Sequence, residues 1–194
     1  MRLYAPAQAA AVLEQLLHDP QIADAVVDRR VIPARAAETR SLPEWLDTRL
    51  RDGLLARGLD RLYRHQADAV EALRAGHDVA VVTPTASGKS LCYNLPVLQA
   101  VAEDPAARAL YLFPTKALSQ DQLAELRELA EAAELPLAAS VYDGDTPAPV
   151  RSSIRAAGQV VVTNPDMLHA AILPHHTKWF ELFEQLRYIV VDEA

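Results

Sequence analysis

From residue 66 onward, short apolar runs alternate with longer segments in which apolar residues recur every three or four positions. Runs rich in valine, leucine and aromatic residues predict strands, whereas the longer spacing predicts amphipathic helices. The strands are expected at 78–83, 108–114, 136–144, 159–165 and 187–194. The helices are expected at 66–76, after residue 90, and at 116–134, 149–158, 166–173 and 177–186. This alternation predicts an α/β fold with a mainly parallel sheet and helices on both faces.

The N-terminal part of the chain has a different pattern. Residues 1–40 begin with one helical stretch and continue as a mixed segment with several arginines, so we expect a short helical and irregular extension. The arginines make this segment locally basic. A solvated surface connector is nevertheless the preferred interpretation, and a nucleic-acid contact is the alternative. Residues 41–58 predict a further helix, which starts near Ser41 or Leu42 and ends at Gly58. The predicted organisation is an extension, 1–40, followed by one lobe, 41–194.

Composition narrows the class of protein. The chain has 194 residues, of which 51% are hydrophobic and 23% charged, as in a soluble globular protein. No apolar run approaches the roughly 18 residues that a membrane span needs. The N-terminus lacks the basic-then-apolar layout of a signal peptide, so a cytoplasmic, monomeric protein without a membrane partner is expected. The single cysteine, Cys92, excludes an internal disulfide framework and predicts a buried thiol.

The net charge of −7 argues against a protein that grips nucleic acid by bulk electrostatics. A local track of backbone amides and a few lysines stays compatible with this charge. In parallel α/β sheets, ligands bind beyond the carboxyl ends of the strands. The chain carries its polar motifs at those positions: TPTASGKS, PTKALSQDQ, YDGDT, TNPDML and DEA.

Residues 83–90, TPTASGKS, resemble a phosphate-binding loop, whose usual pattern is G-x-x-x-x-G-K-[ST]. Gly88 allows close approach of the backbone to phosphate, Lys89 supplies a positive charge, and Ser90 offers a hydroxyl to Mg²⁺. Thr83 replaces the first glycine, and Ala86 lies where glycine is common. The alternative interpretation is a polar turn that caps a core helix.

An ATPase also needs acidic residues at the end of another strand. Asp192 is expected to hold Mg²⁺ largely through water, and Glu193 to orient and deprotonate the attacking water. Alone, the two acids could form a solvated turn. Upstream, Gln66 could read adenine through both ends of its amide, although an exposed helix residue is the simpler interpretation.

The motifs LYRHQ, TPTASGKS, PTKALSQDQ, YDGDT, TNPDML and VVDEA occur in the order found in superfamily 2 helicases of the DEAD/DEAH type. The resemblance covers roughly residues 40–194. In finer detail the chain is similar to a bacterial DEAH-like DNA helicase group related to mitomycin-repair helicases and fungal RecQ-like relatives. The resemblance implies the first of two RecA-like lobes, with a P-loop NTPase fold and ATP and Mg²⁺ as cofactors. A second lobe with an arginine finger is expected beyond Ala194, and the zinc-binding C-terminal region of the finer group has no counterpart here.

The resemblance also implies functional residues. The nucleotide-binding residues would be Leu62, Gln66, Thr85, Ala86, Ser87, Gly88, Lys89 and Ser90, with Lys89, Asp192 and Glu193 in catalysis and with Ser90 and Asp192 as magnesium ligands. The nucleic-acid contacts would be Thr115, Lys116, Gly144, Asp145, Thr163 and Asn164. Short polar side chains at helix N-termini suit phosphate contacts that do not read bases. Helix capping alone is the alternative role for several of them.

The function expected from these features is the motor lobe of an ATP-dependent DNA helicase that acts on single-stranded or partly duplex DNA, with a role in DNA repair. An RNA helicase or a translocase that does not separate strands is the first alternative. A second alternative is that the 194 residues by themselves bind nucleotide without catalysis.

Overall fold

The computed structural model describes residues 6–28, 30, 36–84 and 87–192. Thr85, Ala86 and Glu193, three of the expected site residues, therefore lie outside the described residues. The chain divides into two compact units, Met1–Ala36 and Ala37–Ala194. The first contains α1 (Pro6–Leu17) and the short α2 (Pro20–Ala23), whose N-terminus is capped by the Asp19 side chain.

The second unit contains a four-stranded parallel sheet in the order β4-β5-β3-β6. These strands are β3 (Arg108–Leu112), β4 (Ala139–Val141), β5 (Val160–Thr163) and β6 (Leu186–Val191). The expected α/β fold with a parallel sheet is confirmed. Because all four strands are parallel, the segments that follow them leave the sheet at one edge.

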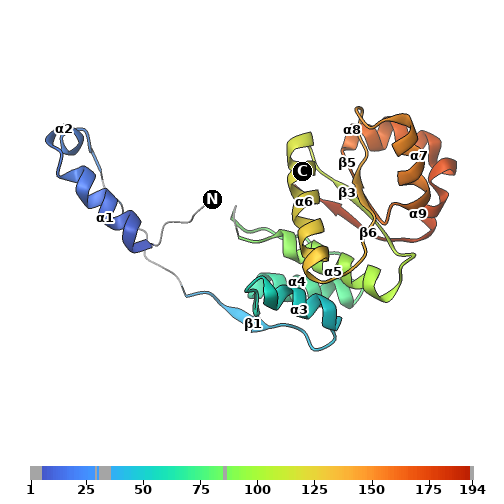
Figure 1. The fold of residues 1–194 in the computed structure, drawn as a ribbon, viewed down its shortest axis with the longest axis horizontal. Coiled ribbons are helices and arrows are strands. Elements are labelled where there is room, and N and C mark those ends of the chain that lie inside the picture. The colour runs from blue at the N-terminus through green and yellow to red at the C-terminus, as the bar shows by residue number, and fades with distance from the viewer. Residues whose placement is uncertain (1–5, 29, 31–35, 85–86, 193–194) are drawn as a thin grey trace. The chain divides into compact units, whose positions relative to one another are not determined.

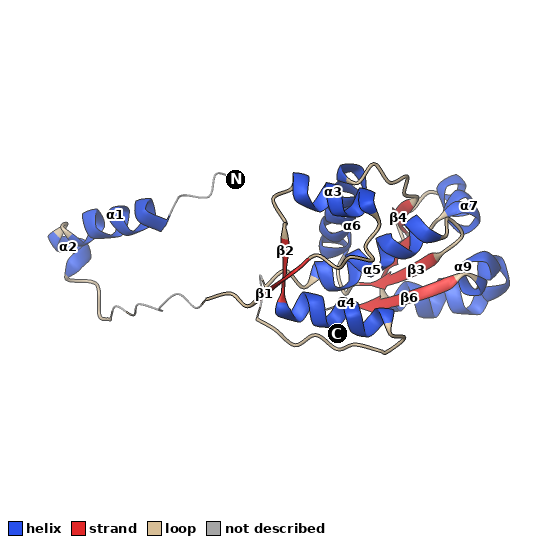
Figure 2. Ribbon diagram, turned by 90° about the horizontal axis from the view of Figure 1, so that it is seen from below, coloured by secondary structure: helices blue, strands red, loops and turns tan. Residues whose placement is uncertain are grey.

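Helices cover both faces of the sheet (Figures 1 and 2). Alternate residues of β3 and the position after it point to opposite faces, since successive side chains of a strand alternate. Tyr111 and Phe113 pack into a core shared with α3 (Thr48–Ala56), α4 (Arg64–Arg74), α5 (Ser90–Glu103) and α6 (Lys116–Ala132).

Leu110 and Leu112 pack into a second core on the other face. The elements on this side are α7 (Ala148–Ala157), α8 (Pro165–Met167), a π-helical turn at Leu168–Ile172, a 3₁₀ segment at Leu173–Trp179, and α9 (Phe180–Glu184). Trp179 is 1% exposed and makes an edge-to-face contact with Tyr142, with ring centroids 4.7 Å apart. Among the described residues, no helix is long and apolar enough to cross a bilayer.

The strand expected at 78–83 is wrong: residues 78–83 have no strand pairing and run as a loop after α4 (Figure 2). Val82 is 94% exposed. Val79 and Val81 instead line a pocket together with residues of β6, which is an edge strand of the described sheet. A β-branched apolar run suits a strand, but strand pairing also needs close backbone contact, and here the pocket lies between this segment and the open edge of β6.

The helix expected from residue 41 begins later, at Thr48, where the side chain of Asp47 accepts a 2.9 Å hydrogen bond from the backbone N–H of Arg49. The earlier residues form β1 (Thr39–Ser41), which pairs antiparallel with β2 (Arg61–Tyr63). Aspartate is a strong N-cap, and the chain folds the preceding residues into a turn instead. The expected end is confirmed, because the helix stops just before Gly58, which has φ +75°.

Candidate active site

The loop that leads into α5 is closed by its own hydroxyl groups. Oγ1 of Thr83 lies 2.6 Å from Oγ of Ser87, so the threonine that replaces the usual glycine has a definite partner. Gly88 has φ +75°, a left-handed conformation that favours glycine. The helix then begins at Ser90. Free N–H groups at a helix N-terminus provide a favourable environment for phosphate.

Gln66 ties this loop to the start of α4. Its Nε2 donates to the carbonyl oxygen of Gly88 at 2.7 Å, and its Oε1 accepts from the backbone N–H of Tyr63 at 2.8 Å. Both ends of the amide are therefore engaged within the protein, and the side chain is only 3% exposed. In this arrangement, contact with adenine requires Gln66 to exchange one of these bonds. Leu62 is fully buried in the core, away from solvent.

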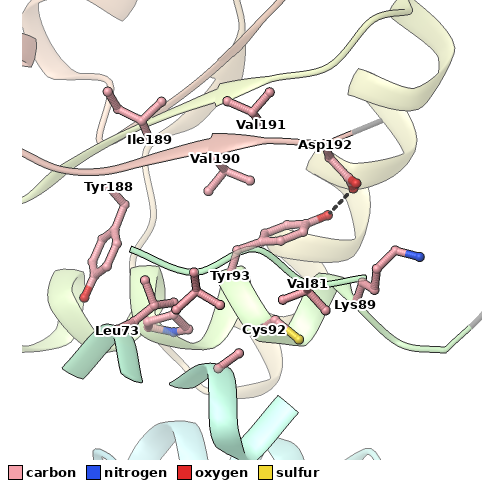
Figure 3. Close-up of a pocket in the computed structure, with 13 residues that line it drawn as sticks. Leu73, Val81, Lys89, Cys92, Tyr93, Tyr188, Ile189, Val190, Val191 and Asp192 are labelled. Carbon is pink, nitrogen blue, oxygen red and sulfur yellow. Dashed lines mark hydrogen bonds between the residues drawn. The ribbon is translucent and has the colours of Figure 1, made fainter. Parts of the chain in front are cut away.

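Lys89 and Asp192 line the same pocket, although they come from opposite ends of the motif series (Figure 3). The Lys89 ammonium donates to the carbonyl oxygens of Thr83 at 3.1 Å and of Pro84 at 3.3 Å. These neutral acceptors hold the charge at the loop, and a phosphate oxygen is a stronger acceptor for the same group. Asp192 directly follows β6, where its N–H donates to the carbonyl of Leu112 at 3.2 Å.

The two expected magnesium ligands have partners that sequence reasoning missed. Oγ of Ser90 donates to Oε1 of Glu125 at 2.8 Å. The hydroxyl of Tyr93 lies 3.2 Å from Oδ2 of Asp192 and 2.7 Å from Oε1 of Gln122. The only signal in the sequence is spacing: Gln122 and Glu125 are three positions apart in a predicted helix and therefore share a face.

Burial sets the protonation of two further groups in this pocket. Burial, reinforced by the charge of Asp192, raises the pKa of Tyr93 well above its usual value, so the phenol stays a proton donor. Burial also raises the pKa of the Cys92 thiol to about 11. Cys92 is 3% exposed and unpaired in a disulfide, which confirms the expected buried thiol and argues against a nucleophile.

The expected nucleic-acid residues follow β3, β4 and β5. Thr115 caps α6 through a 3.3 Å bond from the N–H of Leu118, and Asn164 caps α8 through a 2.8 Å bond from the N–H of Met167. Thr163 is 1% exposed, and its hydroxyl donates to the carbonyl of Tyr142 at 2.7 Å. Thr115 and Asn164 therefore have capping roles that leave other atoms for a ligand, whereas the Thr163 side chain is engaged inside the protein.

Lys116 and Asp145 form an exposed ion pair across two of these loops. The hydrogen bond with Asp145 raises the pKa of Lys116, and the same bond lowers the pKa of Asp145. Gly144, beside Asp145, is exposed. The sheet order brings the loops after β4, β5, β3 and β6 to one edge, so the ion pair and the pocket belong to the same side of the molecule.

Comparisons with known proteins agree with this geometry. The ATP-dependent helicase YprA of Bacillus subtilis, described as uncharacterized, is 52% identical over 181 residues, which are 93% of this chain and 24% of that protein. The ATP-dependent helicase hrq1 of Schizosaccharomyces pombe is 40% identical over 167 residues, 84% of this chain and 16% of that protein. A crystal structure of the DUF1998 helicase MrfA bound to DNA and AMPPNP matches with a TM-score of 0.82 and 52% identity, over 88% of this chain and 25% of that one.

The chain thus spans a quarter or less of the length of these relatives. The family model of the DEAD/DEAH box helicases matches residues 63–194, which include the loop at 83–90, the α6 N-terminus and the acidic end of β6. The chain therefore belongs to the DEAD/DEAH box helicase family.

Proposed function

We propose that the chain is the ATP-binding motor lobe of an ATP-dependent DNA helicase with a role in DNA repair. The observation that carries this proposal is that Lys89 and Asp192 line one pocket. A lysine for the phosphates and an acid for the metal ion must lie together in a site that hydrolyses ATP. The likeness to helicases, including one crystallised with DNA and AMPPNP, supports it.

In this proposal the triphosphate lies against Gly88 and the N-terminus of α5. Lys89 leaves the carbonyls of its own loop and pairs with the terminal phosphates, where its charge stabilises the transferring group. Ser87, together with Thr85 and Ala86 outside the described residues, completes the cradle. Gln66 is the residue proposed to hydrogen-bond to adenine. It would have to exchange its bond to the carbonyl of Gly88 to do so.

The donor set fits magnesium, because the Ser90 hydroxyl and the Asp192 carboxylate supply hard oxygen atoms. Bound there, the ion would neutralise charge on the phosphates. Only two protein oxygens are proposed, in keeping with the preference of Mg²⁺ for several water ligands. Among the described residues no group of three or more histidine, cysteine or acidic side chains could hold a metal ion. Glu193, just past those residues, is the proposed base that orients water.

The proposed nucleic-acid track consists of Thr115, Lys116, Gly144, Asp145, Thr163 and Asn164. Backbone amides and short polar side chains bind phosphate without reading sequence, as a translocating motor requires. Thr163 is 1% exposed, its hydroxyl bonds to the carbonyl of Tyr142, and its own carbonyl accepts from the N–H of Phe113, so a direct phosphate contact would require a local rearrangement at this position. Such contacts do not by themselves distinguish DNA from RNA, because the difference depends on the sugar 2′-hydroxyl. An RNA helicase lobe is therefore the second candidate.

Nucleotide binding tests the proposal directly. Lys89→Ala removes the charge that pairs with phosphate, so the affinity for an ATP analogue is expected to fall at least about 100-fold, the worth of roughly 3 kcal/mol for a charge-assisted contact. Lys178→Ala is the matched control, since Lys178 is exposed and lies in the 3₁₀ segment away from the pocket. Both are measured by titration with a fluorescent ATP analogue. Equal affinity in the two variants would show that the pocket is not the nucleotide site.

A steady-state ATPase assay on the full-length protein addresses the substrate. Single-stranded DNA is expected to stimulate its hydrolysis of ATP more than RNA of the same sequence, and Lys89→Ala is expected to abolish the stimulated rate. Greater stimulation by RNA would favour the second candidate.

A further inference from the structure

The helix α6 bonds directly to Ser90 and reaches Asp192 through the hydroxyl of Tyr93. Glu125 accepts the hydrogen bond of Ser90, and Gln122, one turn earlier, shares the hydroxyl of Tyr93 with Asp192. Gln122 is the last residue of the motif PTKALSQDQ and Glu125 lies just beyond it, and neither is among the residues assigned above to nucleotide, metal or nucleic acid. We propose that α6 positions the magnesium ligands, with Glu125 acting on Ser90 and with Gln122 acting on Asp192 through Tyr93. This inference rests on the proposed function.

The first arm concerns the direction of the Ser90 lone pairs. A serine hydroxyl has one proton and two lone pairs. Because the proton of Ser90 is directed to Oε1 of Glu125 at 2.8 Å, the lone pairs point elsewhere and stay available to a cation. Glu125 is half-buried on α6, which restrains its carboxylate. A carboxylate that orients a metal ligand in this way lies outside the coordination sphere but affects the affinity for the metal.

The second arm concerns Asp192. The phenol of Tyr93 has a single proton and two acceptors within reach, Oδ2 of Asp192 at 3.2 Å and Oε1 of Gln122 at 2.7 Å. While the proton points to Asp192, one carboxylate oxygen is held in place. This restraint acts on Oδ2 and would persist while the carboxylate binds a water of the cation through its other oxygen, and Gln122 accepts the proton whenever Asp192 moves away. The pair therefore restrains Asp192 without leaving a buried polar group unpaired.

The test compares nucleotide affinity with and without the cation. The protein is titrated with a fluorescent, non-hydrolysable ATP analogue in Mg²⁺ and in EDTA. The dissociation constant in EDTA divided by that in Mg²⁺ reports the contribution of the metal to affinity. Glu125→Ala is expected to lower this ratio about tenfold, the lower end of the effect of removing a residue that orients a metal ligand. The affinity in EDTA should stay unchanged, because Glu125 does not touch the phosphate loop's cation, Lys89.

Three further variants sharpen the result. Glu125→Gln keeps an acceptor oxygen, so it should restore most of the ratio, which a loss of charge alone would not. Glu131→Ala, an exposed glutamate on the same helix, should behave as the parent. Tyr93→Phe removes the hydroxyl that holds Asp192 and should lower the ratio severalfold. It carries the test if Glu125→Ala fails to fold, as judged by circular dichroism.

The inference is overturned if Glu125→Ala and Tyr93→Phe have the ratio of the Glu131→Ala control. It is also overturned if they lose affinity equally in Mg²⁺ and in EDTA, since that result indicates damage to the loop rather than to the metal ligands. Failure of the parent to bind the analogue in either condition contradicts the proposed function itself. The two failures are thus distinguishable.

Discussion

At the scale of single residues, Gly88 shows how a loop position can be required for more than its flexibility. A Cβ atom built on Gly88 would lie 2.7 Å from Nε2 of Gln66, which bonds to the carbonyl of the same glycine. Gln66 could move aside only by giving up that bond, and it is buried at both ends. The glycine of the motif therefore serves the contact between the loop and α4 as well as the approach of phosphate.

Gly88→Ala is expected to lower the free energy of unfolding by about 1–3 kcal/mol, because φ is +75° and the new Cβ displaces Gln66. Affinity for an ATP analogue should fall with it. Gly144→Ala is the control, since its Cβ would meet nothing within 4 Å and its φ is not positive. Urea denaturation measures both. Equal stability losses in the two variants would contradict this account of Gly88.

Residue types in order along the chain identified Lys89, Ser90 and Asp192 as candidates, because a phosphate-binding loop and an acidic strand end are local patterns. Their partners were not predictable in the same way. Glu125 reaches Ser90 across a sequence separation of 35 residues, and Tyr93 reaches Asp192 across 99. Such contacts depend on how α5, α6 and β6 pack, which no local pattern reports.

At the scale of elements, α6 connects several parts of the proposed site. Thr115 caps it, Lys116 begins it, and Gln122 and Glu125 follow within the next turns. The helix is held against α3 by a close crossing at Gly53, where an added Cβ would lie 2.7 Å from the backbone nitrogen of Ala133 and 2.8 Å from the carbonyl carbon of Ala132. Backbone atoms cannot move aside as a side chain can.

Gly53→Ala should therefore push α3 and α6 apart and reduce the free energy of unfolding by about 1–3 kcal/mol, as for other overpacked cores. Thermal and urea denaturation give the measurement, with Gly144→Ala again as the control. A stability equal to that of the control would mean that the helices have room to separate without cost.

The sequence-based predictions failed for two elements, one helix start and one strand. The helix expected from residue 41 starts at Thr48, because Asp47 provides the cap. Residues 39–41 instead form β1, which pairs with β2. The strand expected at 78–83 stays outside the sheet. Both errors have one cause: apolar spacing shows that a segment can be buried on one side, but not which hydrogen-bonding partner lies beside it.

At the scale of the whole molecule, the net charge of −7 opposes binding to nucleic acid. Within the proposed track, Lys116 is already paired with Asp145, so a phosphate must compete with a carboxylate for the ammonium. Both side chains are exposed, and this makes the exchange of partners accessible. We therefore expect the ion pair to weaken the binding of a strand at the proposed track.

Asp145→Asn is expected to tighten binding to single-stranded DNA severalfold, since it frees Lys116 and removes a negative charge near the phosphates. Lys116→Ala should weaken binding and reduce the slope of log affinity against log salt by about one. Fluorescence anisotropy across a salt series measures both. Asp52→Asn changes the net charge equally at an exposed site on α3 and should leave binding nearly unchanged. Weaker binding by Asp145→Asn would mean that the carboxylate of Asp145 itself helps to hold the strand, which contradicts a purely competing role for the ion pair.

The sequence alone determined the α/β class, the positions of the polar motifs that follow β3, β4, β5 and β6, and the burial of Cys92, because apolar periodicity and small-residue loops are properties of neighbouring residues. Only the tertiary structure decided that Gln66 is engaged by the loop, that α6 bonds to Ser90 directly and to Asp192 through Tyr93, and that residues 78–83 lie outside the sheet. Those outcomes are contacts between segments far apart in the chain, and their geometry exists only once the helices have packed on the strands.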